Sequence, residues 1–194
     1  MAKVLAPLFS VKARGQIGKS IVFFPWKSIN AVRSYVIPAN PNTAGQQAQR
    51  TIMTGAVDEW HAAGYTAADK TAWNKFASTL AGALSGFNAM VRSYIDALVA
   101  ELPWLRIANV TTKGPTVTTV DVDAVVTSVA DFTCFWGTSP TFMPESIDAI
   151  STEVAVTFVL EGLKDGVIYY YMIKPKLTTN AGRTGVYKYK HVAP

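Results

Sequence analysis

The sequence predicts an α+β protein of several domains, with an extended N-terminal arm, a small three-helix unit and a C-terminal antiparallel β-sandwich. Three observations support this fold class. Residues 1–41 are rich in β-branched and aromatic residues, apolar residues recur every three or four positions over 42–105, and apolar and polar residues alternate over 106–194. A chain of 194 residues with 49% hydrophobic content can fill cores of this size.

The arm, residues 1–41, contains two segments typical of β-strands. "SIVFFPW" and "NAVRSYVIP" predict a β-hairpin or a pair of loose strands. Pro25 has no backbone N–H, so we expect the first strand to lie at a sheet edge or to bend there. Such an edge offers a place for adding to the sheet of a neighbouring protein.

The helical domain, residues 42–105, has well-marked helix ends. Asn42 or Thr43 is expected to cap the first helix, which Gly64 ends. Thr66 followed by Asp69 is typical of a capping box at the start of the second helix. The third helix follows in "SGFNAMVRSYIDALVAELP", where proline stops it. Tryptophans 60 and 73 fall at helical core spacing, so we interpret them as core residues rather than ligand platforms.

The sandwich domain, residues 106–194, shows strand periodicity in "DFTCFWGT", "EVAVTFVLEG", "VIYYYMIKPKL" and "TGVYKYKHV". Cys134, the single cysteine, shares a strand face with Phe132 and Trp136 and has no basic neighbour in sequence, so we expect a buried and unreactive thiol. Strand parity makes Phe135, Tyr170 and Tyr187 candidates for exposed aromatic side chains.

Charge is distributed unevenly along the chain. Residues 1–57 contain seven lysines and arginines and no Asp or Glu, whereas residues 106–194 contain eight basic and eight acidic residues. This asymmetry predicts that the N-terminal segment meets an anionic partner, either nucleic acid or an acidic protein surface. Basic and aromatic residues do not alternate as in a single-strand binding groove, so nucleic acid is the less expected partner.

The segment "GQIGKS" ends like a phosphate-binding loop, but the pattern fails at its first glycine, where the chain has Ala13. A strand-like segment also follows it in place of a helix, so we interpret its glycines as turn residues. Asp121 and Asp123 share one side of a strand without a catalytic partner, which predicts a solvated face. We expect no enzyme activity, no cofactor, no metal site and no membrane span.

Two resemblances add to this reading. "LEGLKDGVIYYYMIKP" resembles the fibronectin type III and immunoglobulin-like sandwiches, which implies that Tyr169 makes the corner hydrogen bond and Trp136 lies in the core. The stretch "SPTFMPESIDAIS" departs from that pattern and predicts an extra loop. "VRSYVIPANPNTAGQQAQR", "AWNKFAS" and "SGFNAMV" resemble a module of tailed-bacteriophage structural proteins, over residues 13–95, which implies a noncatalytic virion component.

Three hypotheses for function follow. The preferred one is a capsid decoration or cement protein, present in many copies, whose arm and helices dock on a major capsid or other virion protein with an acidic surface and whose sandwich projects outward. The alternatives are a tail or neck component that contacts host glycans, and a genome-binding packaging protein. The residues expected to dock are Lys12, Arg14, Lys19, Phe23, Phe24, Trp26, Lys27, Arg33, Tyr35 and Arg50.

Overall fold

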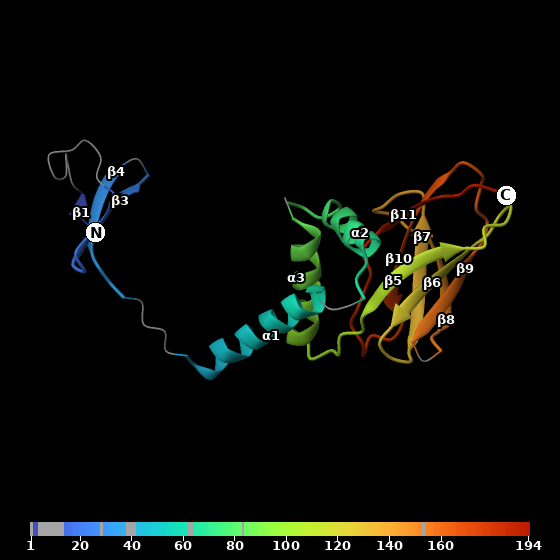
Figure 1. Cartoon of the computed structure of the whole chain (residues 1–194), viewed down its shortest axis with the longest axis horizontal. Coiled ribbons are helices and arrows are strands. Elements are labelled where there is room, and N and C mark those ends of the chain that lie inside the picture. The colour runs from blue at the N-terminus through green and yellow to red at the C-terminus, as the bar shows by residue number, and fades with distance from the viewer. Residues whose placement is uncertain are drawn as a thin grey trace. The chain divides into compact units, whose positions relative to one another are not determined.

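The computed structural model describes residues 2–3, 14–27, 29–37, 42–61, 64–82, 84–152 and 154–194. The chain divides into two compact units, which we call the N-terminal unit (Met1–Thr43) and the C-terminal unit (Ala44–Pro194). The described part of the chain is a mixed α+β structure in which every strand pairing within the sheets is antiparallel (Figure 1). Within it, no helix is both long and apolar enough to cross a membrane.

The N-terminal unit contains one four-stranded sheet, which we call the N-terminal sheet. Its strands are β1 (Ala2–Lys3), β2 (Gly15–Ile17), β3 (Ile21–Trp26) and β4 (Ile29–Ser34), in the spatial order β1-β4-β3-β2. The segments that predicted a hairpin are β3 and β4, and "GQIGKS" supplies β2 and the turn that follows it. Gly18 has φ +53° in this turn, a conformation that glycine adopts at little cost. The interpretation as a turn residue is confirmed for Gly18 and wrong for Gly15, which begins β2.

The expectation of an edge position for the strand that contains Pro25 is wrong. β3 lies in the interior of the sheet, between β4 and β2. β2 pairs with β3 only as far as Phe23, opposite Gly15, while Pro25 pairs with Asn30 of β4. Pro25 therefore lies beyond the end of β2, where its missing N–H removes no ladder hydrogen bond.

The C-terminal unit begins with three helices, α1 (Ala44–His61), α2 (Ala67–Ala77) and α3 (Gly86–Val99). The predicted capping box at the start of α2 is confirmed, since the Thr66 hydroxyl accepts from the backbone N–H of Asp69 and the Asp69 carboxylate accepts from that of Thr66. Trp73 is 1% exposed, and Trp60 packs against the same cluster. Both tryptophans are thus core residues, as their spacing predicts.

Seven strands follow and form two sheets packed face to face. One sheet has the order β5-β6-β9, with β5 (Ile107–Lys113), β6 (Val120–Val126) and β9 (Ala155–Leu160). The other has the order β11-β10-β7-β8, with β7 (Asp131–Gly137), β8 (Glu145–Ile150), β10 (Ile168–Pro175) and β11 (Tyr187–Lys190). The end of "SPTFMPESIDAIS", predicted as an extra loop, forms β8, which pairs with β7 along its whole length.

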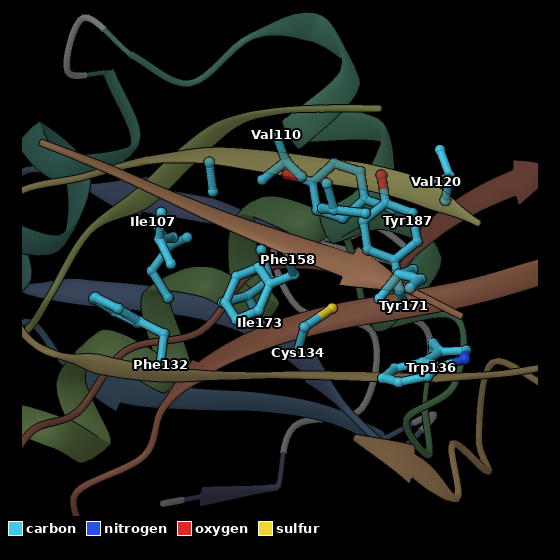
Figure 2. Close-up of a cluster of buried hydrophobic side chains, with 14 of the residues drawn as sticks. Ile107, Val110, Val120, Phe132, Cys134, Trp136, Phe158, Tyr171, Ile173 and Tyr187 are labelled. Atoms are coloured by element: carbon cyan, nitrogen blue, oxygen red, sulfur yellow. The ribbon is translucent and has the colours of Figure 1, made fainter. Parts of the chain in front are cut away.

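The core between these sheets consists of side chains that alternate along each strand. Figure 2 shows Phe132, Cys134 and Trp136 of β7 in one layer with Ile173 and Tyr171 of β10. Cys134 is 0% exposed, so its predicted burial is confirmed. Burial also raises the pKa of its thiol, because the thiolate would lose its hydration there.

The helix α2 is joined to the sandwich through Asp69, a carboxylate that is 0% exposed. Besides its capping-box bonds, this carboxylate accepts from the backbone N–H groups of Asn109 (2.9 Å) and Val110 (3.3 Å) at β5, and from the hydroxyl of Tyr187 in β11. A buried charge is stable only when such donors replace its lost water. One side chain therefore holds α2 against an edge strand of each sheet.

Two further contacts fix the same junction. The Val186 N–H donates to the Ala72 carbonyl of α2 (3.0 Å), and a Cβ on Gly185 would lie 2.2 Å from the Ala72 backbone, so only glycine allows this approach. The sandwich also contacts α1, because Arg106 donates two hydrogen bonds to the Glu59 carboxylate of that helix, at 2.6 and 2.7 Å. The helices and the sandwich are thus packed as one unit.

Candidate docking site

The N-terminal sheet carries apolar side chains on both of its faces. Residues that pair directly across an antiparallel ladder share a face, and successive residues of one strand alternate between faces. One face has Ile17, Ile21, Phe23 and Val32, and the other has Val22, Phe24, Trp26 and Ile29. A sheet face of this kind needs a second layer to bury it.

Four of these eight side chains, two on each face, are exposed, and the other four are half-buried. Trp26 is 56% exposed, Ile17 is 46% exposed and Ile29 is 42% exposed, whereas only Ala31 is buried among the described residues of the sheet. Exposed apolar surface concentrated on one small unit marks a site of interaction with another molecule. The N-terminal sheet is therefore the candidate docking site.

Exposed cations lie among these apolar side chains. Arg14, Lys19, Lys27 and Arg33 are all exposed, and the guanidinium of Arg33 lies 5.5 Å from the centre of the Phe24 ring. Residues 1–43 contain six lysines and arginines and no Asp or Glu. The site therefore combines apolar contact area with positive charge, which favours an acidic partner.

The structure brings most of the predicted docking residues together. Phe23 and Tyr35 are half-buried, and Tyr35 donates its backbone N–H to the Ser20 carbonyl at 2.7 Å, which places it beside the turn that carries Lys19. Lys12 lies outside the described residues. Arg50 belongs to α1 in the C-terminal unit, so it is not part of the sheet.

The predicted exposed aromatics of the sandwich are only partly exposed. Phe135 and Tyr170 are half-buried on the outer face of the four-stranded sheet. The prediction for Tyr187 is wrong, because this side chain is 7% exposed and its hydroxyl donates to Asp69. Its register opposite Tyr171 sets it on the inner face, where the two rings stack at 5.2 Å.

Lysine and arginine side chains cover the aromatic rings on this outer face. Lys75 lies 5.5 Å from the Tyr170 ring centre, and Lys174 lies 5.7 Å from that of Phe135. A third pair lies beside them, with Arg183 only 3.5 Å from the Phe76 ring centre. Burial lowers the pKa of Arg183 to about 10. Sequence reasoning missed this surface, because half of its residues come from α2 and from the loop before β11, which are distant in sequence from the strands that they contact.

The polar clusters considered for catalysis have structural partners. Asp123 accepts from the Lys113 ammonium (2.8 Å) and from the Thr157 hydroxyl (2.7 Å), and the hydrogen bond from Lys113 is the main cause that lowers its pKa. This arrangement agrees with a solvated strand face. Among the residues that the structure describes, no group of three or more His, Cys, Asp or Glu side chains could hold a metal ion.

Comparisons with solved structures find likenesses that each cover between 44% and 57% of this chain. No protein-family model matches it, and no curated protein matches it. A myokine structure has a TM-score of 0.39 and 16% identity, covering 46% of this chain and 98% of its own. The FN5 domain of Drosophila Lar has a TM-score of 0.35 and 12% identity, covering 48% and 99%. The sensor domain of the anti-sigma factor RsgI4 of Pseudobacteroides cellulosolvens has a TM-score of 0.34 and 13% identity, covering 46% of this chain and 96% of its own.

Proposed function

We propose that this chain is a noncatalytic structural protein of a tailed-bacteriophage virion, and that it docks through its N-terminal sheet on an acidic surface of a capsid protein. The observation that carries the proposal is the combination of exposed apolar side chains on both faces of that sheet with six cations and no acid over residues 1–43. The resemblance of residues 13–95 to phage structural modules supports the virion. Capsid decoration is the preferred role, because a repeated lattice makes modest contacts sufficient through avidity.

We also propose that the sandwich is of the fibronectin type III kind. Its seven strands divide into a three-stranded and a four-stranded sheet, as in immunoglobulin-like domains. Tyr169, the second residue of β10, accepts the backbone N–H of Lys164 at 3.0 Å, which matches the corner hydrogen bond expected from the sequence motif. In this role the sandwich and the helices form a rigid body that the N-terminal unit attaches to the particle.

Cosedimentation with empty capsids of the virus of origin tests the docking proposal. We expect the full chain to sediment with capsids, and the chain without residues 1–41 to remain in the supernatant. Charge reversal by Lys19→Glu together with Arg33→Glu is expected to weaken binding by about 10-fold or more, because each reversal replaces attraction by repulsion. Arg92→Glu, on the exposed surface of α3, is the matched control.

Unchanged binding after deletion of residues 1–41 would contradict the proposal. Labelling that places copies at one vertex only would favour the tail or neck, where the sandwich would contact host glycans. A DNA mobility shift that disappears with added salt would favour genome binding instead, since phosphate contacts depend steeply on salt. The half-buried, lysine-covered rings of Phe135 and Tyr170 offer little free stacking surface for a neutral sugar.

A further inference from the structure

A cleft of about 300 Å³ lies between α2 and β11, within the C-terminal unit. Its lining is mostly small and apolar, and two lysines border it. The lining residues are Ala68, Thr71, Ala72, Lys75, Val186, Tyr187 and Lys188. Because Asp69 and Gly185 hold α2 against the strand, the cleft is a rigid feature rather than a gap between loose elements.

The strand beside the cleft has a free edge. β11 is the outermost strand of its sheet, and the Val186 N–H just before it points away from β10, to the Ala72 carbonyl. Backbone groups alternate in direction along a strand, so the N–H and C=O groups of Lys188 and Lys190 also point away from β10. In the described part of the chain, no strand pairs with this side of β11.

The charge around the cleft selects among possible occupants. Lys188 and Lys190 are exposed and Lys75 is half-buried, and no salt bridge joins any of the three to a carboxylate in the described residues. Asp69, the nearest carboxylate on α2, already accepts from the sandwich. Lysines on an edge strand disfavour pairing with a second copy of the same strand, because like charges would meet. They attract an extended segment that carries carboxylates.

We propose that the α2–β11 cleft and the free edge of β11 bind an extended acidic peptide segment of a partner protein. The segment adds as a strand beside β11, with its main chain on Lys188 and Lys190, an apolar side chain in the cleft and carboxylates beside Lys75 and Lys188. This site goes beyond the docking function proposed above, because it uses the C-terminal unit and does not depend on the N-terminal sheet.

Fluorescence anisotropy of a labelled peptide tests the proposal with the full chain. The probe is a peptide of about nine residues in which Glu alternates with Val or Thr. We expect saturable binding that weakens about 5-fold or more with Lys75→Glu and with Lys188→Glu, since each reversal removes one ion pair and adds a repulsion. Lys70→Glu makes the same change on the same helix, where the lysine instead lies over the Trp60 ring, and it should leave affinity unchanged.

Strand addition is tested separately by amide hydrogen exchange. We expect the probe to slow exchange at the N–H groups of Lys188 and Lys190, and a central proline in the probe to abolish that protection, because proline cannot pair in a ladder. The proposal is overturned by absence of probe binding, by equal loss in the Lys70 variant, or by unchanged exchange at both amides. Equal affinity for an oligothymidylate of the same charge also overturns it, in favour of a general anion-binding surface. None of these outcomes affects capsid docking through residues 1–41, which has its own test.

Discussion

Replacement of Asp69 by Asn is expected to destabilise the C-terminal unit strongly, although the side chain keeps its shape. The carboxylate is 0% exposed and accepts from five donors: two from Thr66, and one each from Asn109, Val110 and Tyr187. An amide offers one oxygen, so at least the two donors on one carboxylate oxygen lose their acceptor and meet an NH₂ group. Hydrogen bonds to a charged acceptor contribute about 1.5–3 kcal/mol each, so we expect the loss of two to cost about 3–6 kcal/mol.

Urea unfolding followed by tryptophan fluorescence measures this loss, and thermal unfolding should show a decrease in Tm of about 10 °C. Asp58→Asn, at an exposed position of α1, makes the same chemical change and should alter stability by no more than about 0.5 kcal/mol. A double-mutant cycle with Tyr187→Phe should show coupling between the two side chains. A loss below about 1 kcal/mol for Asp69→Asn would refute the reasoning that this carboxylate joins α2 to the sandwich.

Three further predictions follow from buried groups. Burial raises the pKa values of Tyr171 and Tyr187 above their ordinary value near 10, so the folded state keeps protons that the unfolded chain loses. The free energy of unfolding should therefore be unaffected by these groups below pH about 10 and fall above it by about 1.4 kcal/mol per pH unit for each tyrosine. Urea titrations at several pH values measure this dependence. Gly185→Ala should destabilise by more than about 3 kcal/mol because its Cβ would overlap the Ala72 backbone, whereas Gly45→Ala, with open space around it, should be neutral or stabilising; equal effects in thermal unfolding would contradict this. The Cys134 thiol should react with a thiol reagent only in denaturant, and rapid labelling of the native chain would show that it is accessible.

Much of the local structure could be predicted because neighbouring residues decide it. The Thr66–Asp69 capping box depends on two side chains three positions apart, and the turn at Gly18 depends on one positive φ angle. The same is true of the hydrogen bond from the Lys164 N–H to the Tyr169 hydroxyl, whose partners lie five positions apart. Period-two and period-3.6 patterns likewise predict which segments are strands and which are helices.

The sequence by itself thus determined the helices, most of the strands, the burial of Cys134 and the basic character of the N-terminal segment. Only the tertiary structure decided what Asp69 and Tyr187 do, because their contacts join segments 118 positions apart, and no local pattern encodes such a pairing. Strand parity made Tyr187 a candidate for the exposed face, and that prediction is wrong because its pairing with Tyr171 of β10 sets it on the inner face. The cleft beside β11 also exists only because α2 packs there. The sequence of β11 shows that its lysines alternate, but it does not show that α2 lies next to them.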